Sequence, residues 1–519
     1  MAESGRLRRG FFASLKMTAI GFGADMKKSK APLSTPGSLA LLASLALLCA
    51  AATTSLAATG QAYLKRGEPQ RDGRGWVEMS ECGAIVPEGG KLTLRADMGS
   101  VSVAVGEPGK MACEVRINAY TGDRAQALRM FRAINLEIHS TGNGALLAAR
   151  GFDSARERHS RMDVQFSFSV PRRFNVDLET HGGDVEVASL DGELRATTAG
   201  GEIRTGDISG PVYLETAGGS IRVGNIGKRL EARTAGGNVH VGDVNGEASI
   251  ETSGGEIYAG TIKGSLRATT AGGDIAVRGV GGPAVVETAG GHIQMGDCGG
   301  SVQAETAGGN IRVLGARGMV RAETAGGGIA LFRLQSGVEA ETSAGPILAE
   351  IAADRQAFAP SDLETGVGDI QVFLPVNLPL RVDAVIDQAA GHRIVSDFPV
   401  TYQGQSEDTG FPFHTVHGEC TLNGGGKALK VHTEMGNIEI RKADSSALTQ
   451  LRMRQEDYWK NFVTRQQQQL QQQVEMMIEK LRQRQEEQLR FQQKFLEQQQ
   501  KQLQEIQKQQ QQPDDDNDD

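Results

Sequence analysis

The feature that most constrains this chain is a tetrapeptide, Thr-Ala-Gly-Gly or a close variant, that returns every 18 residues. Ten copies follow one another without insertion, beginning at Thr180, Thr198, Thr216, Thr234, Thr252, Thr270, Thr288, Thr306, Thr324 and Thr342. Two more begin at Thr365 and Thr433, which lie 23 and 68 residues after the copy before each. So regular a register predicts small units that stack on one another, because one unit alone cannot bury an apolar face.

Within each repeat, apolar and polar residues alternate with the period of a β-strand. A β-branched residue stands five places after every Thr, at Val185, Ile203, Ile221, Val239, Ile257, Ile275, Ile293, Ile311, Ile329 and Ile347. Apolar residues also stand ten and fourteen places after the Thr, with Gly residues between them. We expect about three short strands per repeat, and a structural ladder of stacked side chains from Ile203 to Ile329. The Gly-Gly pair predicts positive φ angles and close backbone approach at one corner.

This pattern predicts an all-β fold, a parallel β-solenoid of 18-residue coils. A β-propeller is the alternative, but its blades need roughly 40 residues or more. The composition agrees with a repeat architecture, since 67 of 519 residues are Gly and only 5% are aromatic. About twelve coils at roughly 4.8 Å each predict a stack of about 55 to 60 Å.

The N-terminal residues read as an export signal, and we assign residues 1–57 to an N-terminal extension and signal peptide. A basic segment with Lys27, Lys28 and Lys30 precedes an apolar run from Leu39 to Ala52, which is short for a membrane span. Ser55-Leu56-Ala57 then offers a cleavage site with small residues. Met26 is an alternative start. We therefore expect an exported protein, in the periplasm, on the cell surface or outside the cell.

The remaining domain boundaries follow from changes in composition. Residues 58–75 are expected to be a linker, 76–178 a β-rich N-terminal cap, 179–372 the repeat solenoid, and 373–443 a final coil and C-terminal cap. In the N-terminal cap, strands are predicted at Lys91–Ala96, Ser100–Val105 and Cys113–Asn118. A short helix is predicted from an N-cap at Asp123. Such caps cover strand edges that would otherwise promote aggregation.

From residue 444 to 512, Gln, Glu, Lys and Arg dominate, which predicts a long helix or coiled coil; a disordered Gln-rich tract is the alternative. The apolar residues keep helical or heptad spacing, with a shift of register, at Leu470, Val474, Met477, Leu481, Leu489, Leu496, Leu503 and Ile506. A lone helix would expose this stripe, so we expect a homo-oligomer that forms through residues 444–512. Phe491 and Phe495 leave room for another partner. Residues 513–519 form an acidic tail.

The cysteines give no strong signal for a metal or redox centre. Outside the targeting segment, Cys82, Cys113, Cys298 and Cys420 have no CxxC pairing. A disulfide between Cys82 and Cys113 is one interpretation, and buried free thiols are the favoured one. Cys298 takes a place in the repeat that otherwise holds Ile, Val, Leu or Ala, so we expect it in the core.

Two groups of residues are candidate metal ligands. His414, His417 and Cys420 would need one helical face, but the surrounding residues favour a strand, on which a spacing of three alternates faces. Glu287, Glu305, Glu323 and Glu341 stand just before the Thr of successive repeats and should stack at the strand spacing. We interpret this acidic column as a solvated face, with a divalent-cation or cationic-partner ladder as the weaker hypothesis. No cofactor is predicted.

Two passages carry a resemblance to a known family. One runs from Val170 through Pro171-Arg-Arg-Phe-Asn-Val-Asp-Leu-Glu-Thr-His-Gly-Gly-Asp-Val into the repeats, and the other combines Ile394-Val-Ser-Asp-Phe-Pro-Val, Leu422-Asn-Gly-Gly-Gly and Thr433-Glu-Met-Gly-Asn-Ile-Glu-Ile. Over about residues 76–442 the chain resembles the bacterial putative-adhesin family of β-strand-repeat domains. The resemblance implies a single-stranded, right-handed β-helix on an exported protein. It implies no enzyme activity and brings no catalytic residues; the helical tail departs from the family pattern.

Three functions remain as hypotheses. The favoured one is a non-catalytic, adhesin-like scaffold at the cell envelope, with an envelope protein or surface glycan as partner. The second is a periplasmic binding or regulatory module whose helical tail engages another protein. A polysaccharide-active β-helix enzyme is a distant third, because the nine regular 18-residue repeats contain no insertion that would build a cleft. A net charge of −8 argues against a nucleic-acid partner.

Overall fold

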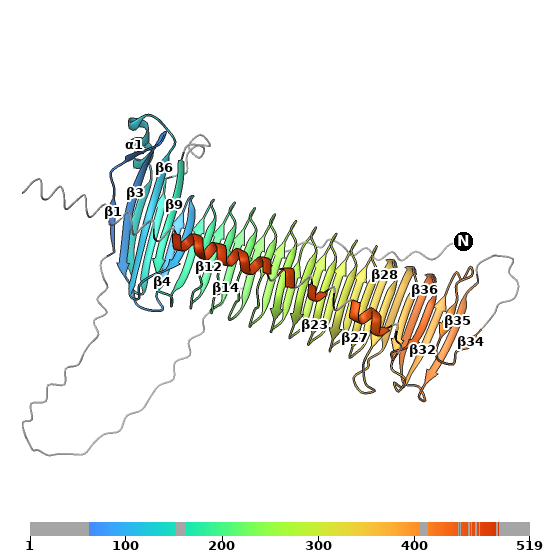
Figure 1. The fold of residues 1–519 in the computed structure, drawn as a ribbon. Helices are drawn as coiled ribbons and strands as arrows, with labels where there is room; N and C mark the ends of the chain where they lie inside the picture. The colour runs from blue at the N-terminus through green and yellow to red at the C-terminus, as the bar shows by residue number, and fades with distance from the viewer. Residues whose placement is uncertain are drawn as a thin grey trace, which may run out of the picture. The chain divides into compact units, whose positions relative to one another are not determined.

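The structure, a computed structural model, describes residues 62–151, 162–403, 414–444 and most of residues 446–486. The described residues are mostly β-strands, which form two long sheets named A and B. Figure 1 shows the strands stacked side by side along the chain. The predicted export signal and the acidic tail lie outside the described residues.

Sheet A begins with β1 (Tyr63–Arg66) and β2 (Gln70–Asp72), which both pair with β3. From β3 the neighbours follow in the order β3 (Gly75–Ile85), β6 (Lys110–Ala119), β9 (Met162–Val170), β5 (Ser100–Val105), β11 (Val185–Val187), β13 (Ile203–Thr205), β15 (Ile221–Val223), β17 (Val239–Val241), β19 (Ile257–Ile262), β21 (Ile275–Val280), β23 (Ile293–Cys298), β25 (Ile311–Ala316), β27 (Ile329–Leu334), β29 (Ile347–Ile351), β31 (Ile370–Leu374), β37 (Ile438–Lys442) and β33 (Ile394–Ser396). From β5 to β33 all of these pairs are parallel.

Sheet B takes the other strand of each repeat. Its neighbours follow in the order β7 (Asn135–Thr141), β8 (Gly144–Arg150), β4 (Lys91–Ala96), β10 (Asn175–Thr180), β12 (Leu194–Thr198), β14 (Val212–Thr216), β16 (Leu230–Thr234), β18 (Ala248–Thr252), β20 (Leu266–Thr269), β22 (Ala284–Thr288), β24 (Val302–Thr306), β26 (Val320–Thr324), β28 (Val338–Ala344), β30 (Ser361–Val367), β36 (Lys427–Met435), β32 (Leu380–Ile386), β35 (Val416–Leu422) and β34 (Thr401–Gln403). Only the end pairs β7–β8, β32–β35 and β34–β35 are antiparallel.

The 18-residue period sets the register of both sheets. Ile257 pairs with Ile275, and Ile275 with Ile293, so equivalent side chains of successive repeats stand one above another. The eight predicted ladder residues, Ile203, Ile221, Val239, Ile257, Ile275, Ile293, Ile311 and Ile329, are each at most 1% exposed. They belong to one continuous apolar core between the sheets.

Each regular repeat has two strands, not the three that were predicted. Leu190, Ile208, Ile226, Val244 and Ile262, ten places after the Thr, pair through single bridges in the first repeats. From β19 onward the sheet A strand extends to include this position. A single apolar residue between two turns is long enough to make one bridge but too short for a strand of its own.

The buried Thr of each tetrapeptide joins its repeat to the one before. In the ten repeats from Thr198 to Thr365 and in Thr433, the hydroxyl donates to the carbonyl of the glycine at the preceding turn, at 2.7–3.1 Å. In most regular repeats the same oxygen accepts from the backbone N–H three residues later; the N–H of Gly309, for example, donates to the hydroxyl oxygen of Thr306 at 3.2 Å. A buried hydroxyl is thereby satisfied on both sides.

The two glycines of the pair have different roles, and the prediction of positive φ angles is wrong for most of them. Gly183 and Gly345 adopt positive φ, whereas the second glycines from Gly201 to Gly327 do not. A Cβ on a second glycine such as Gly291 would overlap the carbonyl of Gly273 in the repeat below. A Cβ on its neighbour Gly290 would meet its nearest atom at 3.4 Å. Close backbone approach therefore requires only the second glycine.

The N-terminal cap is continuous with the stack. The predicted strands at 91–96 and 100–105 are confirmed as β4 and β5, which extend both sheets by parallel pairing with β10 and β11. The predicted helix is also confirmed: α1 (Arg124–Arg132) starts from Asp123, whose side chain accepts from the N–H of Ala125. Beyond these, β9, β6 and β3 switch to antiparallel pairing, which ends the parallel ladder. The segment 58–75 is not a simple linker, because it contains β1 and β2.

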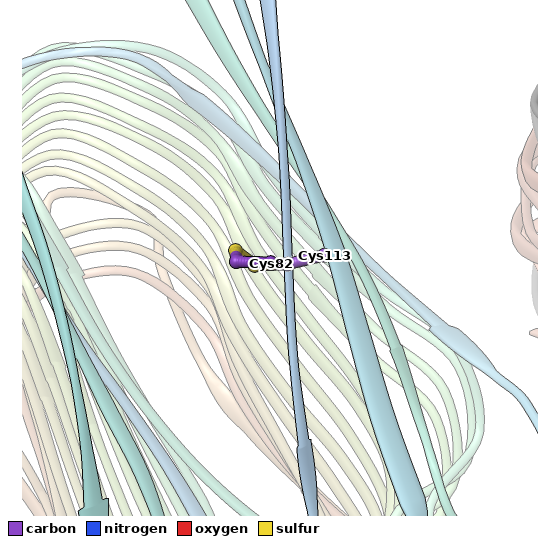
Figure 2. The surroundings of a disulfide bond; sticks show 2 residues. All are labelled: Cys82 and Cys113. Carbon is purple, nitrogen blue, oxygen red and sulfur yellow. A yellow bond between two sulfur atoms is a disulfide. The ribbon is translucent and has the colours of Figure 1, made fainter. Parts of the chain in front are cut away.

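The cap contains a disulfide between Cys82 and Cys113. The favoured interpretation of free thiols is therefore wrong for this pair. The two residues face each other in the register of β3 and β6, with their Cα atoms 4.9 Å apart, within the range for disulfides. Figure 2 shows them on neighbouring strands. Cys298 and Cys420 are free and buried.

The C-terminal end of the stack closes in a similar way. After β31 the chain leaves the regular repeat, forms β32 to β35, and returns as β36 and β37 beside β30 and β31. The last strand is followed by a tail whose described residues between 446 and 486 are helical. Within the described residues, no helix is both long and apolar enough to cross a membrane.

Candidate interaction surface

The second residue of each sheet A strand from β11 to β29 points outward, away from the core. These residues stand in register and form the outer column of sheet A: Glu186, Arg204, Arg222, His240, Tyr258, Ala276, Gln294, Arg312, Ala330 and Leu348. The column is ionic at its beginning and more apolar toward its end. The sequence pattern does not reveal this column, because its residue type changes from repeat to repeat, whereas the inward positions are repeatedly Ile or Val.

The helical tail lies along this column (Figure 1). Near the start of the tail, Arg452 forms an ion pair with Glu350 at 3.0 Å, and the Glu350 side chain is only 5% exposed. Further along, Lys480 lies 3.5 Å from Glu186, whose side chain is 6% exposed. Arg204 also lies 3.5 Å from Glu186. Two nearly buried carboxylates are therefore each paired with a cation from the tail.

Between these ion pairs, an aromatic residue of the tail fills an apolar patch. Trp459 is 7% exposed and packs with Tyr258, Ala276, Leu314 and Phe332 in a cluster separate from the main core. A large aromatic in an apolar pocket with flanking charges is the arrangement found at the centre of many interfaces. The sequence contained a signal for this contact in Trp459, one of only two Trp residues, but no signal for its partner.

The tail covers polar groups as well. Burial lowers the pKa of His240, and the nearby charge of Arg222 lowers it further. Among the described residues, its Nδ1 atom and the Oε1 atom of Gln294 are buried without a hydrogen-bond partner. Such groups weaken the contact, because each loses its water without replacement.

The predicted apolar stripe of the tail is partly used on the same chain. Met477 and Leu481 are each 4% exposed, and Leu470 and Val474 are half-buried. The other stripe residues, Leu489, Leu496, Leu503 and Ile506, lie outside the described residues. Sheet A of the same chain therefore buries part of the stripe that a lone helix would expose.

The acidic column on sheet B stands in the predicted register. Glu287, Glu305, Glu323 and Glu341 pair in sequence across β22, β24, β26 and β28, and Glu364 of β30 extends the column. Arg267 lies 3.3 Å from Glu287, and Arg321 lies 4.0 Å from Glu323. Burial raises the pKa of Glu341, and the neighbouring carboxylates Glu323 and Glu364 raise it further. In the described part of the chain, no group of three or more His, Cys, Asp or Glu residues could hold a metal ion.

Among the described residues, the candidate zinc ligands His414, His417 and Cys420 do not form one metal-binding group. His417 lies 2.5 Å from Asp383 on the neighbouring strand, whereas Cys420 is buried in the core. Cys298 pairs with Val280 and Ala316 in the core ladder, and burial raises its pKa to about 12, with Asp297 adding to the rise. A thiol with so high a pKa is protonated and unreactive at neutral pH.

Two solved structures are similar to this chain. One is a putative cell adhesion protein from Clostridium sporogenes ATCC 15579, with 10% identity and a TM-score of 0.13, and the match covers 72% of this chain and 100% of that chain. The other is a putative adhesin from Bacteroides fragilis NCTC 9343, with 12% identity and a TM-score of 0.16, covering 70% of this chain and 96% of that chain. No family model and no curated protein matches the chain. Because both scores and identities are low, the function has to be argued from this chain itself.

Proposed function

We propose that this chain is an exported, non-catalytic β-solenoid that serves as an adhesin-like scaffold at the bacterial cell envelope or surface. The observation that carries the proposal is the hydrogen bond from each Thr to the glycine of the preceding turn, repeated from Thr198 to Thr433. It keeps both sheets in register across the repeats, which suits a rigid support for contacts along its faces. An envelope protein or a surface glycan is the partner that we propose.

The charged side chains on these faces favour a scaffold over a polysaccharide-active enzyme. A glycoside hydrolase needs two carboxylates that flank a sugar. Here many outward charges pair with their neighbours instead, such as Arg204 with Glu202, Arg278 with Asp243, and Arg233 with Glu231. These pairs lie on strands and corners of the stack, and they relieve repulsion between like charges in successive repeats.

The second candidate, a periplasmic binding or regulatory module, is favoured by the tail on sheet A. A helix held by two ion pairs and one Trp is an element that a partner protein could recognise or displace. We also keep the proposal of a homo-oligomer, but with a different set of contact residues on the tail. Because Met477 and Leu481 are buried on sheet A, self-association would use Met453, Met476 and Ile478, which are 59%, 64% and 46% exposed.

Localisation and attachment can be tested together in the native bacterium. Fractionation should place the protein in the envelope or the medium, and recovery in the cytosol would contradict export. A strain without the gene should attach less to host or abiotic surfaces, and the full-length gene should restore attachment. A gene that encodes the protein without residues 444–519 separates the two candidates. If bacteria with this truncated protein still attach to surfaces, the result supports the scaffold. If the full-length protein retains one defined partner in a pull-down and the truncated protein does not, the result supports the binding module.

A further inference from the structure

The tail helix and sheet A have nearly the same spacing. Glu350 lies on β29 and Glu186 on β11, which are nine strand intervals apart, and their partners Arg452 and Lys480 are 28 residues apart. This gives about 3.1 helical residues per strand. A helix rise of 1.5 Å and a strand spacing of about 4.8 Å predict about 3.2 for a helix perpendicular to the strands. The tail helix therefore runs nearly perpendicular to the strands of sheet A.

Sheet A continues beyond the last described ion pair. The outer column passes from Glu186 to Ser102 on β5, Ser167 on β9, Glu114 on β6 and Glu81 on β3. These are four further strand intervals, which correspond to about 13 helical residues after Lys480. The last described residue of the tail is Glu486, and the sequence continues to residue 519. The residues after Glu486 are therefore numerous enough to reach β6 and β3.

A hollow lies on this continuation of sheet A, independently of the spacing argument. Val77 and Met79 of β3 give it an apolar lining, and Glu68, Glu81 and Glu114 bring three carboxylates to it. Lys65, which faces Glu81 in the register of β1 and β3, brings one cation. Burial raises the pKa of Glu114; the charge of Glu81 adds to the rise and Arg116 opposes it. An apolar hollow whose lining has three carboxylates and one cation fits a segment with apolar and basic side chains on one helical face.

The tail has such a segment at the matching distance. Arg490, Phe491, Lys494 and Phe495 form two pairs that are four residues apart, so on a helix both aromatics share one side and both cations share the adjacent side. About 13 residues after Lys480 is near residue 493, in the middle of this set. The order of charges also agrees, because Arg490 would meet Glu114 first and Lys494 would meet Glu81 next.

We propose that residues 487–495 continue the tail across β5, β9, β6 and β3. Phe491 and Phe495 occupy the hollow lined by Val77 and Met79, and Arg490 and Lys494 pair with Glu114 and Glu81. The tail then spans the outer face from the C-terminal repeats to the N-terminal cap. This inference does not depend on the proposed scaffold function.

Disulfide trapping in the full-length protein tests the placement. The pair Met79→Cys and Phe495→Cys should form an intramolecular disulfide, seen by mass spectrometry of the linked peptides. The matched pair Met79→Cys and Gln493→Cys should form it several-fold more slowly, since Gln493 faces the opposite side of a helix. Equal rates for the two pairs, or no link, would overturn the proposal. A link only between chains would also overturn it, because the occupant would then be a second copy.

Charge reversal tests the ionic part on the same reporter pair. Arg490→Glu with Lys494→Glu should slow trapping several-fold, and adding Glu81→Lys with Glu114→Lys should restore the rate. Melting followed by circular dichroism checks that each variant keeps its β-structure. A trapping rate that is indifferent to the first reversal, or that the second reversal fails to restore in a folded protein, would refute the assigned pairs.

Discussion

The hydroxyl of Thr306 lies 2.9 Å from the carbonyl oxygen of Gly291, which belongs to the preceding repeat. Thr306 is buried, and its oxygen also accepts from the N–H of Gly309 at 3.2 Å. The side chain thus links two successive turns of backbone, and its methyl group is buried with it. A Ser could make both hydrogen bonds and a Val could fill the space, but only Thr does both.

Thr306→Val should therefore lower the stability although it conserves shape. It leaves the carbonyl of Gly291 and the N–H of Gly309 without this partner inside the stack, which costs about 1–3 kcal/mol. Urea unfolding followed by circular dichroism measures the loss. Thr197→Val is the matched control, because Thr197 is only half-buried and alternates with the buried positions of β12. Equal midpoints for the two variants would contradict this role of the hydroxyl.

Gly290 and Gly291 offer a second matched comparison. Gly291→Ala should markedly lower the melting temperature, because its Cβ would overlap the carbonyl of Gly273 and push two repeats apart. Gly290→Ala should be tolerated, since its nearest neighbour would be 3.4 Å away. The chain itself has side chains at the equivalent first position, in Ala344, Val367 and Met435, but never at the second. Similar melting temperatures for the two variants would refute this distinction.

The period made much of the fold predictable. Spacing alone predicts that Ile275 belongs to an inward ladder, and its register with Ile257 and Ile293 follows from the same period of 18 residues. The number of strands was not predictable in this way, because a single bridge at Ile226 and a strand ending at Ile262 look alike in a pattern of apolar residues. Periodicity reports which side chains are buried, not how many consecutive residues pair.

The contact between tail and sheet was not predictable, for a different reason. The spacing of Met477 and Leu481 shows that one side of the helix is apolar, but not which surface covers it. For Trp459 the covering surface combines residues as distant in sequence as Tyr258 and Phe332, and it exists only once the repeats have stacked. The pairing of Cys82 with Cys113 likewise depends on the register of β3 and β6, which no spacing in the sequence specifies.

The acidic column should show a dependence on pH at Glu341. Burial, followed by the charges of Glu323 and Glu364, raises the pKa of this carboxyl, so its protonated form is favoured in the folded protein. The stability that this provides is present below the ordinary pKa of Glu and is lost as pH rises through the raised value. Glu341→Gln should accordingly raise the melting temperature at pH 7 and have little effect at pH 4.

Glu287→Gln is the control for this prediction, because Glu287 has a cation partner in Arg267 and should gain nothing from neutralisation. A rise at pH 7 that is equal for the two variants would contradict the local cause. The weaker hypothesis of a cation ladder has its own test, with calcium at millimolar concentration. Calcium should leave the melting temperature unchanged, and a rise that disappears when all four glutamates become Gln would support the ladder instead.

The final prediction concerns Trp459. In a Trp76→Phe background this is the only Trp, so its fluorescence reports the contact between the tail and sheet A. Because Trp459 is 7% exposed, its emission should be that of an apolar environment. Ala276→Glu introduces a charge into the apolar cluster that contains Trp459, at an outward position where neighbouring repeats have Tyr258 and Gln294, so β-structure should persist while the emission shifts to the red. Ala276→Ser, which adds one atom, should keep the wild-type spectrum. An unshifted spectrum for Ala276→Glu would mean that the helix is not held at this patch in solution.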